Sequence, residues 1–341
     1  MRAQLEHISK SIQELEGKTD LGKPYFSSKN YKAIDFSQEH FREIKNTNRD
    51  AKLCFIDGGN QEIASAANFS LHACRVYYGI FEKSKRINQH AESFFTLTTA
   101  ESRNGTIYYV SKVIPMRDSE YLPSDFEIDS SDHSITIGGH MAKINSLGGV
   151  MRKLAEWTII NRALQELNAG DVVVKDGTLQ LTITGEEQYA GPIMEQCIDK
   201  GVALTGLAKT SNLFTTTGLP LFYAINKLSS SGEKWYYNPI CEISSLKHEV
   251  EMCAVKLHEA SGYVFRFEIS KQQESQLHNV VSLLADNAKD PSFIGYPYGL
   301  IDADKQAQVP NDEIKAAKAL LGAYNSGLMR SVDAHDLLNR L

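Results

Sequence analysis

The sequence has few features that would anchor the protein in a membrane or cross-link it outside the cell. It contains five cysteines, an odd number, and no C-x-x-C pair, which favours a reducing compartment over a disulfide framework. No uninterrupted apolar run is long enough to span a bilayer. Residues 1–10 mix charges without the apolar centre of a signal peptide. We therefore expect a cytoplasmic protein with no membrane partner.

The sequence also lacks an excess of positive charge. Its formal net charge is −6, which argues against a protein that coats nucleic acid through its total charge, although a local basic groove would still bind phosphates. The histidines show no H-E-x-x-H or other closely spaced ligand pattern. There is no internal repeat, low-complexity tract or Pro/Gly-rich linker, so nothing in the composition forces a division into domains.

The sequence does contain enough apolar residues for a substantial core, and two short stretches that are alike. The chain has 341 residues, of which 42% are hydrophobic, and this length suits roughly one to three domains. Residues 53–59 (LCFIDGG) and 172–178 (VVVKDGT) are strand-like apolar runs that end on Asp57 and Asp176 and are expected to turn at the following glycine. Two carboxylates in the same setting could converge on one metal site.

The order of the expected elements indicates the fold. Residues 1–19 form an amphipathic helix, and residues 20–49 look irregular. Strand-like segments follow at 52–57, 65–82, 91–99 and 106–115, with an acidic loop at 118–132. Next come a helix at 149–167, the Asp176 strand, a helix at 185–200 and a strand at 202–208. Further β segments are expected at 233–243 and 254–269, and further helices at 272–289, 300–307 and 312–325.

Three antiparallel strands followed by helix, strand, helix and strand form the element order of the ribonuclease-H-like fold. We therefore predict an α/β protein with a ribonuclease-H-like mixed sheet flanked by helices, and with helical extensions at the N- and C-terminal ends. The predicted division is an N-terminal helical arm at 1–49, a ribonuclease-H-like domain at 50–310, and a C-terminal helical extension at 311–341 that packs on the same domain.

In that fold, metal-binding acids lie on the first strand, on the first helix, at the end of the fourth strand and on a C-terminal helix. This sequence has Asp57, Glu156 and Asp176 at the first three places, and Asp302 or Asp304 at the last. Hydrolysis of a phosphodiester needs an activated water and a stabilised leaving oxygen, which two divalent ions about 3.5–4 Å apart supply. Because carboxylates suit Mg²⁺ and Mn²⁺, these acids predict a two-metal site.

Each of these residues also has an ordinary structural interpretation. An Asp-Gly pair after a strand is most often a turn. Glu156 could be a solvated residue paired with Arg152, four positions before it. Lys209, which follows the strand at 202–208, could be a surface lysine rather than a phosphate ligand. The presence of all the candidates in the expected order favours the hydrolytic site.

With these residues considered together, the chain resembles the NurA nucleases. The resemblance lies in residues 55–59 (FIDGG), 152–156 (RKLAE), 175–179 (KDGTL), 206–211 (GLAKTS) and 296–304 (YPYGLIDAD), which occur in the family's order. It implies that Asp57, Glu156 and Asp176 are metal ligands and that Lys209 contacts the scissile strand. The family commonly has a histidine where this sequence has Asp304, so Asp304 becomes a catalytic and metal-ligand candidate of different geometry.

The resemblance also implies what the protein does and what it works with. It implies a homodimeric deoxyribonuclease with two Mn²⁺ or Mg²⁺ ions, which acts on single-stranded DNA and duplex ends as a 5′–3′ exonuclease, a single-strand endonuclease or both. The family's partner is a HerA-like hexameric ATPase that moves duplex DNA toward the nuclease, in DNA end processing or in defence. In the expected mechanism Asp57 bridges the ions, Glu156 and Asp176 complete the ligand set, and Lys209 offsets charge on the phosphate.

Two other classes of protein stay open. Asp-Gly turns on a ribonuclease-H-like sheet also occur in actin-like and sugar-kinase ATPases, but those proteins need a second phosphate loop and an adenosine motif, which we do not find in the sequence. The other class is a catalytically weak structural subunit that docks on an ATPase and guides DNA. The apolar face of residues 1–19 and the region 320–341 are candidate contacts with a second subunit or with that partner.

Overall fold

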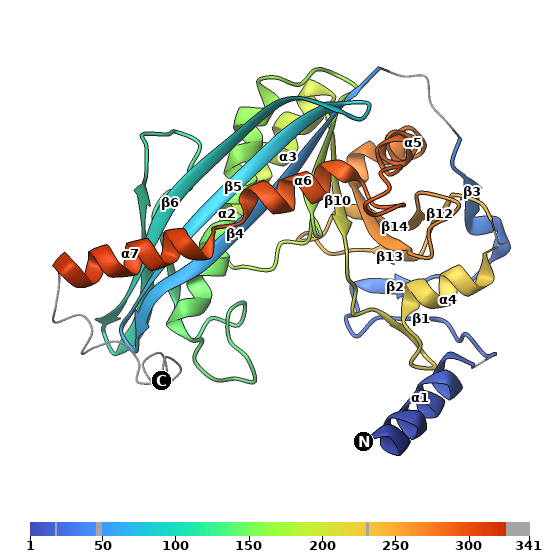
Figure 1. The fold of residues 1–341 in the computed structure, drawn as a ribbon, viewed down its shortest axis with the longest axis horizontal. Coiled ribbons are helices and arrows are strands. Elements are labelled where there is room, and N and C mark those ends of the chain that lie inside the picture. Colours follow the sequence, from blue (N-terminus) through green and yellow to red (C-terminus); the bar gives the residue numbers. More distant parts are fainter. Residues whose placement is uncertain (18, 46–49, 230–231, 325–341) are drawn as a thin grey trace. The chain divides into compact units, whose positions relative to one another are not determined.

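The computed structural model describes residues 1–17, 19–45, 50–229 and 232–324 (Figure 1). The chain divides into two units by its contacts. We call residues 50–175, 181–202 and 299–341 the meander unit, and residues 1–49, 176–180 and 203–298 the second unit. The division passes through a strand that ends at Asp176. The predicted segments 1–49, 50–310 and 311–341 stay a prediction.

The meander unit is built on long strands that follow one another along the chain. Five strands pair in antiparallel succession: β4 (Lys52–Ala66), β5 (Phe69–Glu82), β6 (Lys85–Arg103), β7 (Thr106–Pro115) and β8 (Phe126–Asp129). They confirm the strands expected at 52–57, 65–82, 91–99 and 106–115 and their antiparallel arrangement. On the other side of β4, β9 (Val172–Asp176) runs parallel to it, with Lys175 opposite Ile56. Parallel neighbours need a crossover connection, and helix α2 (Leu147–Leu164) lies in that connection.

Helices lie on both faces of β4. The helices of the meander unit are the short 3₁₀ turn η2 (Ile144–Ser146), α2, α3 (Glu187–Lys200), α6 (Tyr298–Ala307) and α7 (Asn311–Tyr324). A Cβ at Gly58 would lie 2.9 Å from Glu156 Oε1 of α2, whereas a Cβ at Gly59 would lie 2.3 Å from the carbonyl oxygen of Ala307 at the end of α6. Successive residues of a strand point to opposite faces, so α2 and the end of α6 lie on opposite faces of β4.

The two Asp-Gly pairs have different structural roles. The predicted turn after Asp57 is wrong, because β4 continues through Gly58 and Gly59 to Ala66. Glycine is required there because α2 and α6 approach the strand too closely for a side chain. Asp176 does end β9, and Gly177 follows it with φ of +96°, a conformation that favours glycine. The second pair is therefore the predicted turn.

The second unit holds the other strands of the part of the chain that the structure describes. β3 (Phe41–Glu43), β12 (Trp235–Tyr237), β14 (Val250–Lys256), β15 (Phe265–Ser270) and β10 (Ala203–Ala208) are antiparallel neighbours in that order. Two small sheets pair β1 (Pro24–Tyr25) with β11 (Phe214–Thr215), and β2 (Tyr31–Ala33) with β13 (Cys241–Ile243). The helices are α1 (Arg2–Glu16), α4 (Leu221–Leu228) and α5 (Leu277–Asn287), with 3₁₀ turns η1 (Gln38–His40) and η3 (Lys271–Gln276).

The described strands form one large mixed sheet and the two small sheets. The large sheet has eleven strands within the described residues, in the order β3-β12-β14-β15-β10-β9-β4-β5-β6-β7-β8. This order confirms the predicted α/β class with a mixed sheet flanked by helices. The helix expected at 149–167, the strand at 202–208 and the helix at 300–307 are all found, within a few residues of the expected ends.

Three further features of the local structure differ from what the sequence indicated. Residues 20–49 are not simply irregular, because β1, β2 and β3 pair there with strands some 190 to 210 positions later in the chain. The acidic loop at 118–132 contains β8, and α4 was not expected at all. Strands of two to four residues are too short to show a period, so the hydrogen bonds of a distant partner decide their conformation.

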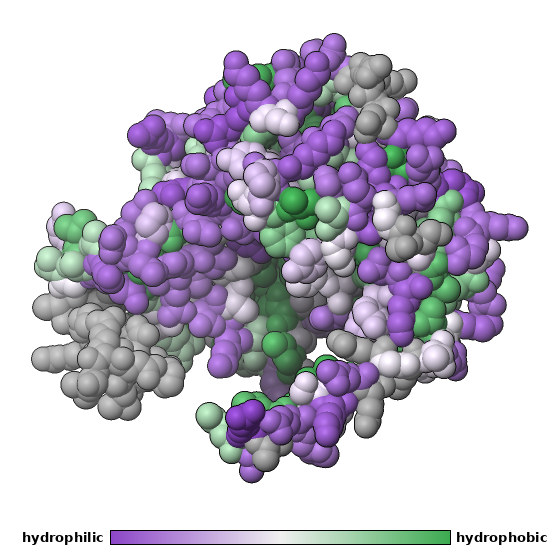
Figure 2. All heavy atoms as spheres, turned by 45° about the vertical axis from the view of Figure 1, so that its right-hand side comes forward, coloured by the Kyte–Doolittle hydropathy of each residue, from purple (hydrophilic) through white to green (hydrophobic). Residues whose placement is uncertain are grey.

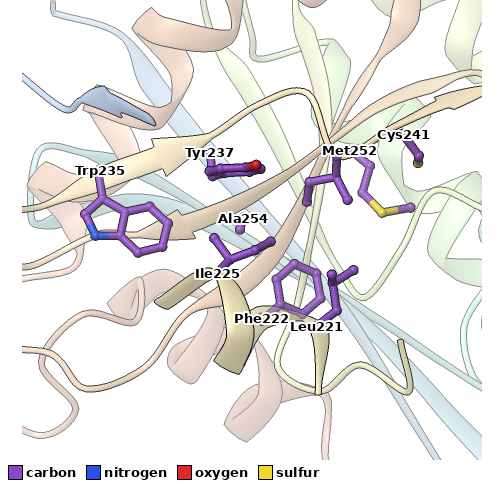
Figure 3. Close-up of a cluster of buried hydrophobic side chains, with 9 residues drawn as sticks. Leu221, Phe222, Ile225, Trp235, Tyr237, Cys241, Met252 and Ala254 are labelled. Atoms are coloured by element: carbon purple, nitrogen blue, oxygen red, sulfur yellow. The ribbon is translucent and has the colours of Figure 1, made fainter. Parts of the chain in front are cut away.

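The core of the second unit joins α4 to its strands (Figure 3). Side chains of α4 pack against Trp235 and Tyr237 of β12 and against Met252 and Ala254 of β14. Cys241 belongs to the same cluster. All five cysteines are buried and free, and Cys54 and Cys74 are core residues of the meander unit.

The face shown in Figure 2 is covered mostly by hydrophilic side chains. Helix α1 has the predicted amphipathic sequence, and its Leu5, Ile8 and Ile12 are 57%, 50% and 50% exposed. Their expected contact with another subunit stays a prediction, and residues 325–341 of the predicted C-terminal contact lie outside the described residues. None of the described helices combines the length and the apolar character needed to cross a membrane.

Candidate metal centre

Three aspartates from different elements come together at β4. One carboxylate oxygen from each of Asp57 in β4, Asp176 at the end of β9 and Asp304 in α6 lies within 4.8 Å of the others. The parallel register of β4 and β9 explains why Asp57 and Asp176 lie together. Ile56 and Lys175 are opposite one another, so the residues that follow them lie side by side on the same face. These are three of the acids that the sequence singled out.

Helix α6 reaches β4 because glycine removes the side chain at two contacts. A Cβ at Gly299 would lie 2.0 Å from the ring of Phe55, and a Cβ at Gly59 would meet the backbone of Ala307. Phe55, Asp57 and Gly59 alternate along β4 and therefore share one face. The helix is thus seated on the face to which Asp57 points, and it brings Asp304 to that carboxylate.

Asp302, the competitor of Asp304, has a different environment. Its carboxylate accepts hydrogen bonds from Arg86 at 2.7 Å and from the Tyr77 hydroxyl at 2.9 Å. It is 8% exposed. Burial and then the hydrogen bond to Asp302 raise the pKa of Tyr77 above its ordinary value, so the phenol stays protonated and donates. Asp302 fixes α6 to β5 and β6, whereas Asp304 belongs to the carboxylate group.

Asp57 and Asp176 each have a fixed polar contact. Asp57 is 8% exposed, and its Oδ1 accepts a hydrogen bond from the backbone N–H of Gly58 at 2.7 Å. Asp176 Oδ2 lies 2.9 Å from Nζ of Lys209. The Lys209 ammonium also lies 5.8 Å from the centre of the Tyr296 ring, within the range of a cation–π contact. The predicted lysine is therefore beside one of the predicted acids.

Glu156 lies on the other face of β4 from Asp57. Its side chain is buried, and its carboxylate forms ion pairs with Arg152 and Lys175. Lys175 alternates with Asp176 along β9, so it points toward α2 while Asp176 points toward α6. The i,i+4 pair with Arg152, considered as the ordinary interpretation, is present, but the Glu156 side chain in it is buried while that of Arg152 is 31% exposed. The role of Glu156 as a ligand stays a prediction.

A second buried ion pair fixes α2 relative to α3. Lys153 Nζ lies 2.8 Å from Glu186 Oε2, and the Trp157 indole donates to Glu186 Oε1 at 2.9 Å. Burial lowers the pKa of Lys153. Burial alone would raise the pKa of Glu186, but Lys153 and the hydrogen bonds outweigh it and lower that pKa. The pair holds the helix that carries Glu156.

Comparison with known proteins now identifies the family. The NurA domain family matches residues 51–309, more than half of the chain. This chain belongs to the NurA family. The crystal structure of the NurA nuclease from Sulfolobus solfataricus is similar with a TM-score of 0.54 at 12% identity, covering 95% of this chain and 93% of that chain. The likeness confirms the predicted ribonuclease-H-like fold.

Two endonuclease V structures are less similar to this NurA-family chain. The catalytic domain of the human enzyme has a TM-score of 0.39 at 11% identity, covering 83% of this chain and 93% of that chain. Endonuclease V from Ciona intestinalis, in complex with a 23-mer DNA that contains an inosine, has a TM-score of 0.39 at 13% identity, covering 92% of this chain and 98% of that chain. No curated protein matches the sequence.

The NurA-family chain has a donor set that fits a hard divalent cation. Three carboxylates within 4.8 Å of one another repel each other unless positive charge lies between them. All-oxygen donors are preferred by Mg²⁺ and Mn²⁺. An aspartate at position 304 fits this set as well as the histidine that the resemblance led us to expect.

Sequence reasoning missed the residues that support the site. Lys175 could have been found, because a lysine inside the buried run VVVKD needs a buried partner. Arg86 and Tyr77 gave no such signal. They lie 216 and 225 positions from Asp302, and no local pattern indicates a contact at that separation.

Proposed function

We propose that this NurA-family chain is a metal-dependent deoxyribonuclease whose centre is formed by Asp57, Asp176 and Asp304. The convergence of three carboxylates from β4, β9 and α6 carries the proposal. Family membership supports it, since the Sulfolobus solfataricus relative is described as a nuclease. The reaction would be hydrolysis of a phosphodiester bond in DNA.

The three aspartates would hold Mn²⁺ or Mg²⁺, with two ions as the proposed number. Bound divalent ions make water nucleophilic at neutral pH and stabilise the negative charge that develops on the leaving oxygen. Asp57 and Asp176 belong to the neighbouring parallel strands β4 and β9. The backbone hydrogen bonds between these strands fix the positions from which the two carboxylates project. Such fixed ligands need little rearrangement when the substrate binds.

Lys209 would bind the scissile phosphate. Its ammonium lies 2.9 Å from Asp176, and its side chain is 40% exposed, so it is accessible to a phosphate. The Tyr296 ring below it restricts where the ammonium moves. A fixed cation beside the reacting phosphate lowers the energy of the transition state, which carries more concentrated negative charge.

Glu156 is proposed as the further ligand that the family resemblance implies. Because residue 58 has no side chain, the Glu156 carboxylate reaches the backbone of β4 directly after Asp57. Because it lies on the face of β4 opposite Asp57, it would contact an ion only if its side chain left Lys175 and Arg152 and turned toward the three aspartates past the open position at Gly58. The Glu156→Gln variant tests this role, since it should lower metal affinity less than Asp57→Asn does.

The finer features of the function are also proposals. They are the action on single strands and duplex ends, the 5′–3′ exonuclease or single-strand endonuclease mode, the homodimer, and the HerA-like hexameric ATPase as partner. The exposed apolar face of α1 supports a contact with another chain. Scattered exposed apolar residues are normal, so this support is weaker than that for the metal centre.

The test uses the purified full-length protein. End-labelled single-stranded and duplex DNA are incubated with Mn²⁺, with Mg²⁺ or with chelator, and Mn²⁺ binding is measured by calorimetry. Cleavage that requires the metal is expected. Intact DNA together with a stable complex with a HerA-like ATPase would instead indicate the structural, DNA-guiding subunit. ATP hydrolysis by the isolated chain without DNA cleavage would indicate the actin-like or sugar-kinase class.

A further inference from the structure

Four aromatic rings of the second unit form a connected cluster, which we call the aromatic patch: Tyr263, Phe265, Phe293 and Tyr296. The ring centres of Tyr263 and Phe293 are 5.1 Å apart, and those of Phe293 and Tyr296 are 5.9 Å apart. Phe265 lies 6.3 Å from Tyr263 and 5.1 Å from Tyr296. Tyr263 and Phe293 are 59% and 39% exposed, whereas Phe265 and Tyr296 are buried. Two surface rings therefore rest on two core rings.

The loops that carry the exposed rings are fixed to each other. Gly295 has φ of +92°, and a Cβ there would lie 2.4 Å from the Ser261 side chain. The Ser261 hydroxyl accepts a hydrogen bond from the backbone N–H of Tyr263 at 3.1 Å, and the N–H of Gly295 donates to the Ala288 carbonyl at 2.9 Å. Because these contacts hold the rings before any ligand binds, little conformational entropy is lost on binding.

The aromatic patch is continuous with Lys209. The Lys209 ammonium lies 5.8 Å from the centre of the Tyr296 ring and 2.9 Å from Asp176 Oδ2. The contacts therefore run from a carboxylate of the proposed metal centre through one cation to buried and then exposed aromatic rings. A strand whose phosphate lies at Lys209 would have neighbouring bases beside Tyr263 and Phe293. Aromatic rings next to a cation are the usual combination in single-strand binding grooves.

We propose that Tyr263 and Phe293 stack with the bases of an unpaired DNA strand and so position that strand for cleavage. An unpaired base has a free π-face whatever its identity, so stacking tolerates all sequences. Bases inside a duplex are already stacked on one another and do not offer that face. The inference rests on the proposed nuclease function and specifies its substrate as a strand that is single-stranded at the patch.

Binding is measured separately from cleavage. The full-length protein is titrated into fluorescently labelled single-stranded DNA and into blunt duplex of the same length, with chelator present so that no DNA is cut. Tyr263→Ala and Phe293→Ala should each raise the single-strand Kd about 5- to 150-fold, the range found when a stacking ring is removed, with little change for duplex. In cleavage assays they should raise KM and leave kcat nearly unchanged.

Two further variants of Tyr263 separate stacking from other uses of the patch. Tyr263→Phe keeps the ring and should bind single strands like the wild type, whereas Tyr263→Leu keeps an apolar side chain without a π-face and should bind as weakly as Tyr263→Ala. Tyr324→Ala removes an exposed tyrosine of α7 (87% exposed) and is the matched control with unchanged binding. The mass of the protein in solution should be the same for all of them.

Several results would overturn the stacking role. They are wild-type affinity in the alanine variants, wild-type affinity in Tyr263→Leu, an equal loss for duplex and single strand, a changed mass in solution, or wild-type protein that binds no single strand. A changed mass, or retention by leucine, would indicate that the patch contacts protein instead. Failure of the nuclease proposal is recognised separately, as wild-type protein that binds DNA but does not cut it with Mn²⁺.

Discussion

The contact between β4 and the end of α6 predicts the effect of a single added methyl group. A Cβ at Gly59 would lie 2.3 Å from the carbonyl oxygen of Ala307 and 3.1 Å from its carbonyl carbon. Both are backbone atoms, so the collision is relieved only if the end of α6 moves away from the strand. Forcing extra volume into a packed contact costs about 1–3 kcal/mol. We expect Gly59→Ala to lower the free energy of unfolding by that amount.

The same movement should weaken metal binding, because Asp304 lies three residues before Ala307. Wild-type protein at a Mn²⁺ concentration of about 100 times its Kd should gain about 2.7 kcal/mol of stability. In Gly59→Ala the distance from Asp304 to Asp57 would change, so the gain should be smaller. Urea unfolding with and without Mn²⁺ measures both the basal loss and the reduced gain.

Gly149 of α2 is the matched control. A Cβ at Gly149 meets no atom within 4 Å, and alanine is favoured over glycine inside a helix by about 0.5–1 kcal/mol. Gly149→Ala should therefore raise the free energy of unfolding and keep the full gain from Mn²⁺. The reasoning is refuted if Gly59→Ala is as stable as the wild type and gains as much from Mn²⁺.

Four further variants test other parts of the structure. Asp304→Asn should abolish Mn²⁺-dependent cleavage with little loss of stability, whereas Asp302→Asn should destabilise the fold by about 1–3 kcal/mol and still cut DNA; the opposite pattern in cleavage assays would exchange their roles. Lys175→Met removes one ion-pair partner of the buried Glu156 and leaves Arg152 beside it. This should cost about 3 kcal/mol in urea unfolding, and a loss below about 1 kcal/mol would contradict the buried pair. Burial lowers the pKa of His72, so at mildly acidic pH the unfolded chain takes up a proton that the folded chain does not. The free energy of unfolding should therefore fall as the pH drops below about 6.5. Urea unfolding at several pH values should show a shallower fall for His72→Gln.

The sequence was sufficient for the parts of the fold that have a period or a distinctive order. The long strands from β4 to β7 alternate, α2 has a broad apolar face, and the Asp176 strand is a continuous apolar run. Short strands such as β1 and β3 were missed because two or three residues show no period. They exist because β11 and β12 supply their hydrogen bonds.

The candidate site shows the same limit at the level of single residues. The order of the acids along the chain indicated Asp57, Asp176 and Asp304, because a strand end or helix can be placed from sequence. The order does not show which face of the sheet each acid occupies, because this depends on the pleat of the strands. In the structure Glu156 and Asp57 lie on opposite faces of β4. The choice between Asp302 and Asp304 needed Arg86, a residue 216 positions away from Asp302.

Cleavage by Asp57→Asn protein tests the central claim most directly. Asparagine keeps the size of the side chain and its acceptor for the Gly58 N–H, so the fold should be kept while the charge that holds a divalent ion is lost. Metal catalysis supplies several kcal/mol of transition-state stabilisation, so the rate on end-labelled single-stranded DNA with Mn²⁺ should fall at least about a hundred-fold. Cleavage by folded Asp57→Asn protein at the wild-type rate, with the same dependence on Mn²⁺, would contradict the account.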